Sequence, residues 1–289
     1  TATQVSAPDT VFWTAADLNT PASAVLIFDS SFNQKVYLGN EAGTALTVLN
    51  SGDGSFITTI DGFNNPEYIV SNPFSGYAYV TNNGNNTIQV VDTTANALVG
   101  SAFGVGAEPD GIAINSAGNR VWVANGAGNS VSVINAGANA VVATVAVPTP
   151  RGIAVNPAGT RVYVVNSNGD SVRVIDVATN TLLPAVIAVG DAPFGVALNP
   201  AGTRAYVTNY IDNTVSVINT DTSTQIAVIP LNLPGGPPGA TGVAVNAGGT
   251  RVYVTNSGAD LLHVINPATN TVTALVAVGD SPFGVAISL

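Results

Sequence analysis

The sequence contains no cysteine and no methionine. Without cysteine the chain has no disulfide, no thiolate nucleophile and no cysteine-ligated metal. The absence of both residues also removes the two most readily oxidised side chains, which favours a life outside the cell. A single histidine, His263, leaves no cluster for zinc or copper and no Ser–His–acid pattern. We therefore expect no catalytic residue, no metal ligand and no cofactor.

Charge is scarce as well, at 8% of residues, against about 25% in an average soluble domain. The formal net charge is −10, and such a surface repels nucleic-acid phosphates and anionic lipids. No apolar run approaches the roughly 18 residues of a membrane-spanning helix, so we expect no membrane insertion. The chain starts at Thr1, which we interpret as the start of a processed or an engineered chain. Removal of a signal peptide would fit the extracellular or cell-surface location that we expect.

A repeat dominates the sequence that remains. Six strand-like tetrapeptides, YLGN, YVTN, WVAN, YVVN, YVTN and YVTN, recur about every 42 residues and end at Asn40, Asn82, Asn125, Asn166, Asn209 and Asn256. A fixed period of roughly 40–45 residues that holds four short strands is the signature of a propeller blade. About seven such periods fit into 289 residues. The sequence therefore predicts an all-β, seven-bladed propeller with four-stranded antiparallel blades.

The fourth repeat illustrates the expected blade. Residues 152–155, GIAV, are small and β-branched, as suits an inner strand that is packed on both faces. Residues 161–166 and 171–176, RVYVVN and SVRVID, are the second and third strands, and 181–189 is the outer one. Turn-forming Asn, Pro and Gly separate these runs.

These residues resemble the YVTN family of β-propeller repeats, named for the tetrapeptide at Tyr79–Asn82. The match covers residues 23–289 and includes the recurring GVAVNPAGTR pattern of the inner strand and its turn. The resemblance implies a seven-bladed propeller of the kind found in exported, surface-layer-type proteins. Related propellers include scaffolds, binding proteins, lyases and lactonases, so the fold alone does not decide the function.

The seventh blade is short of strands. After six repeats only one inner strand, from Pro282 onward, is left, and residues 1–22 are the obvious source of the others. We predict that this N-terminal closure or donor segment contributes strands around Val5 and around Val11, Phe12 and Trp13. The segment closes the blade of its own chain in cis, or completes that of a neighbouring subunit in trans.

Most residues that look chemical occupy repeated slots, which favours structural roles. Basic residues sit five positions before the motif asparagine at Lys35, Arg120, Arg161, Arg204 and Arg251. The slot before the third strand holds Asn or Asp, including Asp170 and Asp260, and needs a hydrogen-bond acceptor rather than a charge. Equivalents of His263 are polar, so we expect this histidine to face solvent.

What remains after this subtraction is a candidate interaction surface. The slot after the loop proline varies between blades, and propeller geometry places it at the mouth of the central channel, near Glu108, Asp191 and Asp280. This slot holds Glu67, Asp110, Arg151, Phe194 and Phe283. The insertion at 231–240, which contains Pro234 and Pro237, and the aromatic Tyr210 complete the candidates.

The prediction for function is therefore an extracellular, non-enzymatic propeller at the cell surface. It would act as a structural or interaction subunit with other protein subunits, including copies of itself through exchange of terminal strands. The alternative is a module that binds a ligand or glycan at the channel mouth. A lyase-like or lactonase-like enzyme is the weakest interpretation, because no matching residues carry over.

Overall fold

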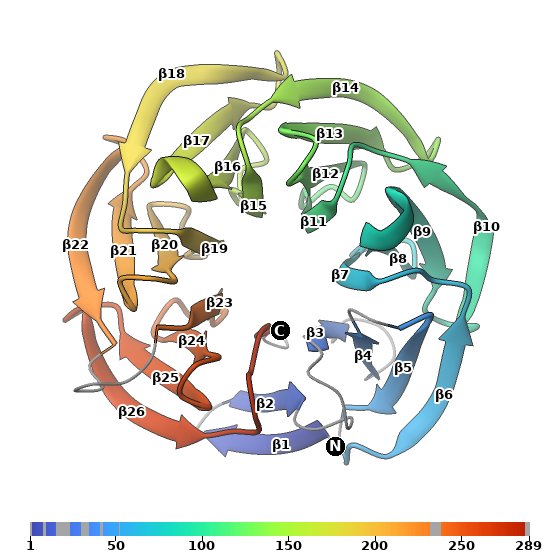
Figure 1. Ribbon diagram of the computed structural model, residues 1–289, viewed down its shortest axis with the longest axis horizontal. Coiled ribbons are helices and arrows are strands. Elements are labelled where there is room, and N and C mark those ends of the chain that lie inside the picture. Colours follow the sequence, from blue (N-terminus) through green and yellow to red (C-terminus); the bar gives the residue numbers. More distant parts are fainter. Residues whose placement is uncertain are drawn as a thin grey trace.

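The computed structural model describes residues 2–7, 10–15, 24–29, 35–40, 43–51, 53–231 and 238–286. Its strands form six four-stranded antiparallel sheets and one two-stranded sheet. The sheets stand in a ring around a central axis, each with one strand near the centre and one at the rim (Figure 1). The fold is an all-β propeller. None of the described residues forms a helix long and apolar enough to cross a membrane.

The blades share one strand order, from the central channel outward. The inner strands are β3 (Ala24–Asp29), β7 (Pro66–Ser71), β11 (Pro109–Ile114), β15 (Pro150–Val155), β19 (Pro193–Leu198) and β23 (Ala240–Val245). The second strands are β4 (Lys35–Asn40), β8 (Tyr77–Asn82), β12 (Arg120–Asn125), β16 (Arg161–Asn166), β20 (Arg204–Asn209) and β24 (Val252–Asn256). The third strands are β5 (Ala45–Asn50), β9 (Thr87–Asp92), β13 (Ser130–Asn135), β17 (Ser171–Asp176), β21 (Thr214–Asn219) and β25 (Leu261–Asn266). The outer strands are β6 (Phe56–Asp61), β10 (Ala97–Gly104), β14 (Ala140–Ala146), β18 (Thr181–Ala188), β22 (Thr224–Pro230) and β26 (Thr271–Ala277).

The prediction of seven four-stranded blades is wrong. Six blades have four strands, and the seventh sheet is a hairpin of β1 (Ala2–Ala7) and β2 (Thr10–Ala15). Its register pairs Val5 with Phe12 and Gln4 with Trp13, so the predicted donor strands pair with each other. The hairpin lies in the ring between the blade of β23–β26 and that of β3–β6 (Figure 1). The expected inner strand near Val285 is not formed within residues 278–286, although this segment runs inward to the channel.

The core lies between blades, because the second and third strands are covered on both faces. Aromatic residues of the second strand fill these seams: Tyr37, Tyr79, Trp122, Tyr163, Tyr206 and Tyr253 are all at most 1% exposed. Basic and tyrosine side chains also bond to the next blade, at the turn between its third and outer strands. Arg161 donates to the carbonyl of Thr220, and the hydroxyl of Tyr79 donates to the carbonyl of Ala136. The structural interpretation of the basic and aromatic slots is thus confirmed.

Candidate functional site

Five of the six inner strands start with an irregular register, and this irregularity shapes the channel mouth. In β15 the register skips from Pro150 to Ile153, so the two residues between do not continue the ladder with β16. The same skip occurs in β7, β11, β19 and β23. Residues in the skip carry the variable slot predicted from the sequence. The backbone is thus shaped by the repeat, while the side chains that it presents differ from blade to blade.

The threonine of the YVTN tetrapeptide takes over the hydrogen bond that the skip leaves open. Thr255 Oγ1 accepts from the backbone N–H of Gly242 at 2.8 Å and donates to the carbonyl of Phe283 at 2.9 Å. Thr208 does the same between Gly195 and the carbonyl of Thr241. Because a buried backbone group without a partner is costly, one hydroxyl here stabilises both its own blade and the next segment.

The loops before these prolines are strained in a regular way. Glu108, Thr149, Ala192 and Ser281 each precede a proline and have a φ between 34° and 51°, which is unusual for residues with a side chain. In each case the backbone N–H donates to a side-chain oxygen of the preceding blade, on Asn86, Asn129, Asp170 and Asp260 respectively. Asn and Asp serve equally, so the prediction that this slot needs an acceptor and not a charge is confirmed.

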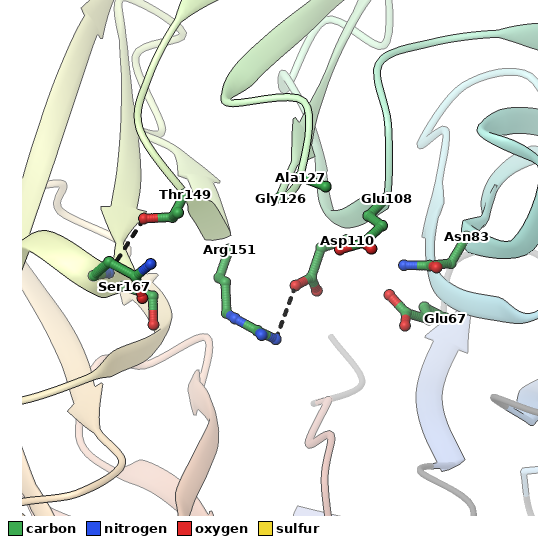
Figure 2. Close-up of a pocket in the computed structure, with 10 residues that line it drawn as sticks. Glu67, Asn83, Glu108, Asp110, Gly126, Ala127, Thr149, Arg151 and Ser167 are labelled. Carbon is green, nitrogen blue, oxygen red and sulfur yellow. Dashed lines mark hydrogen bonds and ion pairs between the residues drawn. The ribbon is translucent and has the colours of Figure 1, made fainter.

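A pocket of about 420 Å³ lies at the mouth, between the second, third and fourth blades. Its charged lining residues are Glu67, Glu108, Asp110 and Arg151, and Figure 2 shows Glu67, Asp110 and Arg151 pointing toward one another. A guanidinium nitrogen of Arg151 lies 3.3 Å from Asp110 Oδ2. Asp110 is 7% exposed, whereas the Arg151 side chain is 47% exposed. The pocket therefore has one half-buried cation among three carboxylates.

An aromatic wall continues from Arg151 to the other side of the mouth. The Arg151 guanidinium lies 5.2 Å from the ring centroid of Phe194, within cation–π range. Phe194 meets Phe283 edge-to-face at 4.9 Å, and Phe283 lies 6.5 Å from Tyr68. Four of the predicted surface residues, Asp110, Arg151, Phe194 and Phe283, thus form a continuous chain of contacts. Glu67 joins them through the pocket lining.

The other sequence candidates lie elsewhere. Pro234 and Pro237 fall outside the described residues. Tyr210 is 37% exposed, and its backbone bonds to Ala192 and Gly239 rather than lining the pocket. Its slot directly after the motif asparagine nevertheless matters, since Asn83, Gly126 and Ser167 occupy it in the blades around the pocket. The sequence prediction missed Asn83, although its position directly after a motif asparagine was a signal that could have identified it.

Below the mouth, inner strands approach each other so closely that only glycine fits. A Cβ on Gly152 would lie 2.4 Å from the carbonyl oxygen of Phe194, and one on Gly242 would lie 2.7 Å from that of Phe283. Such distances are below van der Waals contact. These glycines line an apolar channel cavity of about 300 Å³ together with Ile112, Ile153 and Val196. The lining of this cavity contains no charged residue, whereas the lining of the mouth pocket contains four.

The expectation that His263 faces solvent is wrong. His263 is 0% exposed in β25, between Val254 of β24 and Leu275 of β26. Its ring nitrogens have no partner at hydrogen-bonding geometry among the described residues. Burial lowers the pKa of His263, and the backbone groups of Leu231 and Val254 oppose that shift in part. Across the described residues, no group of three or more His, Asp or Glu side chains could hold a metal ion.

Comparisons with known proteins show the fold and not the family. No protein-family model and no curated protein matches the chain, so the resemblance to YVTN repeats stays a prediction. The chain is similar to a Kuenenia stuttgartiensis hydrazine synthase structure, with 18% identity, a TM-score of 0.79 and coverage of 93% of this chain and 92% of that one. It is equally similar to a functionally unknown protein from Desulfotomaculum acetoxidans, with 19% identity, a TM-score of 0.79 and coverage of 96% and 95%.

Proposed function

We propose that this chain is an extracellular, non-enzymatic binding propeller of YVTN type, an interaction subunit whose channel mouth holds a cationic group of its partner. The observation that carries the proposal is the pocket of three carboxylates and one guanidinium beside an aromatic wall. A cation can replace or join Arg151 among Glu67, Glu108 and Asp110, and the neighbouring rings favour its apolar part.

The charge of the whole mouth face supports this choice. Other loops and turns on the same face carry further exposed acids, Asp170, Asp191, Asp212 and Asp280. Arg151, at the start of β15, is the one basic residue among those that line the pocket. Clustered like charges steer oppositely charged partners and raise association rates. The loss of this steering at high salt is a direct consequence.

The hydrogen bonding inside the pocket supports a non-enzymatic role. Two hydroxyl side chains, Thr149 and Ser167, line the pocket. Thr149 Oγ1 accepts from the N–H of Asn168 and donates to Asn166 Oδ1. The Thr149 hydroxyl is therefore held by two neutral amide groups rather than by a carboxylate or an imidazole that could activate it. The similarity to hydrazine synthase, at 18% identity, carries no residue of a reaction to this chain.

We also propose that the ring closes in cis, with the N-terminal hairpin and residues 282–286 sharing the seventh place. Residues 282–286 repeat the contacts of a following blade, since Thr255 bonds to Phe283 as Thr208 bonds to Thr241. Removal of residues 1–22 should then lower the melting temperature of a chain that stays monomeric when intact. Filaments or rings of the full chain in electron micrographs would instead support closure in trans.

The binding proposal is tested by calorimetry with three probes: a hexalysine peptide, a hexaglutamate peptide and a neutral chitooligosaccharide. We expect the hexalysine peptide alone to bind, with affinity that falls as salt is raised. Asp110→Asn and Glu67→Gln should weaken binding, whereas Asp176→Asn, at the end of β17 on the opposite face, should not. Binding of the oligosaccharide alone would replace the cation proposal with the glycan alternative, and binding of none would overturn both.

A further inference from the structure

The outer strands at the rim have an unusual surface. Asp61 is the single charged residue in all six outer strands. Nine of the thirteen large apolar side chains that are exposed among the described residues lie on these strands: Phe56, Ile57, Leu98, Val141, Val142, Val186, Ile226, Val228 and Leu275. Each outer strand ends its sheet, so one edge of its backbone has no neighbouring strand within the blade.

Proteins usually protect such edges with charged residues, prolines or bulges. Here charges are almost absent, and a bulge or register irregularity is the common device. In β22 the pairing skips Ile226, and in β14 it skips Val142. The bulge shortens the regular edge but leaves its apolar side chain exposed, at 48% for Ile226 and 54% for Val142. The bulges thus limit backbone pairing between an outer strand and a strand of another molecule, while the exposed apolar side chains can still pack against a partner.

A groove distinguishes one part of the rim. A cavity of about 340 Å³ lies between β18 and β22, lined by residues 186–189 and 223–225. Val186 on one side, and Ile226 and Val228 on the other, are 58%, 48% and 50% exposed. We refer to Val186, Ile226 and Val228 with this groove as the rim patch. It combines a concave apolar surface with protruding apolar side chains next to it.

We propose that a second copy of this chain docks on the rim patch, so that two propellers associate side by side. Charge selects this occupant. With a net charge of −10, two copies repel each other when their charged faces meet, whereas the rim, with one charged residue in its six outer strands, lets them approach. The patch also has the two parts that a two-fold interface needs, since it places protruding apolar side chains next to a groove that can receive those of a second copy. The inference deepens the proposed subunit role but does not involve the mouth pocket.

Sedimentation velocity of the full chain from micromolar to millimolar concentration tests the docking. We expect a species of 28.9 kDa at low concentration and one of twice that mass at high concentration. Association should strengthen as salt is raised, because salt screens the repulsion between like-charged copies. This dependence is opposite to that expected for a cation at the mouth, so the two proposals fail separately.

The variant Val186→Lys/Val228→Lys should raise the dimer dissociation constant by about tenfold or more, since it places like charges in contact. Both side chains are at least half exposed, so the fold should tolerate lysine. Val142→Lys, equally exposed on β14, is the matched control and should associate like the wild type. The proposal is overturned if the wild type remains monomeric, if the double variant still dimerises, or if the control loses association equally.

Discussion

The seams between blades and the channel mouth are built from the same repeat, yet they use it in opposite ways. In a seam the same residue type recurs and makes the same bond to the next blade, as Arg120 does to Val177 and Arg204 to Pro267. At the mouth one backbone slot carries glutamate, aspartate, arginine and phenylalanine in successive blades. A residue type that recurs in every repeat therefore indicates a structural role. A position where the backbone is kept but the side chain varies indicates a surface that can bind a partner.

This contrast predicts that changes at a seam cost stability and changes at the mouth cost binding. The largest effect should come from Gly152→Ala, because the added Cβ would lie 2.4 Å from the carbonyl oxygen of Phe194 and 2.9 Å from Gly195 Cα. Both are backbone atoms, so a blade must move. We expect a loss of about 3 kcal/mol in the free energy of unfolding, measured by urea denaturation.

Gly104→Ala is the matched control for that measurement. Nothing lies within 4 Å of a Cβ at Gly104, and its φ is not in the left-handed region. The free energy of unfolding should change by no more than about 0.5 kcal/mol. Equal effects at Gly104 and Gly152 would show that close approach between inner strands does not limit the fold.

The second-largest loss of stability should come from replacing Thr255, which joins the sixth blade to residues 282–286. Thr255→Val should leave the N–H of Gly242 and the carbonyl of Phe283 without their partner. Two backbone groups that lose a hydrogen bond at a buried site cost about 1–3 kcal/mol. Hydrogen exchange should show faster opening of residues 282–286. Thr222→Val, which removes an exposed bond to Thr224, serves as the control; similar exchange in both variants would contradict the assigned role.

The propeller architecture could be predicted from the sequence because the same pattern of strands and turns occurs in repeat after repeat. Six independent copies of the strand pattern correspond to six four-stranded blades, and the Asn or Asp slots hold the loops as expected. The prediction of a seventh four-stranded blade was wrong because the sequence contains no complete seventh copy of the repeat. The arrangement of β1 and β2 depends on long-range contacts that a local pattern does not encode.

His263 shows a second limit. Its equivalents Gln89, Ser132 and Ser216 are polar, which indicated solvent, but all of them are at most 3% exposed. Alternation of polar and apolar residues predicts a half-buried strand when one face of a sheet is open. In a propeller the third strand lies between two blades and is buried on both faces. A polar slot there needs internal partners, as Gln89 Nε2 finds in the carbonyl of Val90.

The buried position of His263 in β25 should make the stability of the chain depend on pH. The lowered pKa of buried His263 means that the unfolded chain takes up a proton at a higher pH than the folded chain does. Stability is then fully present above pH 6.5, the ordinary value, and is lost as the pH falls below it toward the folded-state pKa. His263→Gln introduces the residue that Gln89 already places in the equivalent slot. We expect this variant to lose less stability than the wild type between neutral and mildly acidic pH, in melting temperatures. Parallel pH curves for the two proteins would refute this.

The smallest effect on stability should come from the mouth itself. Asp110→Asn removes the ion pair with Arg151, but the arginine is 47% exposed, so solvent screens the pair and its loss should cost at most about 1 kcal/mol. Asp170→Asn should cost less, because Asn86 and Asn129 make the same bond to the next loop.

The two substitutions should differ more in their effects on binding than in their effects on stability. Asp110→Asn should abolish most of the binding of the hexalysine peptide, whereas Asp170→Asn should weaken it only through the general charge of the face. If both substitutions weaken binding equally, the mouth attracts cations without a defined pocket. If Asp110→Asn unfolds the chain, this position belongs to the seams rather than to recognition.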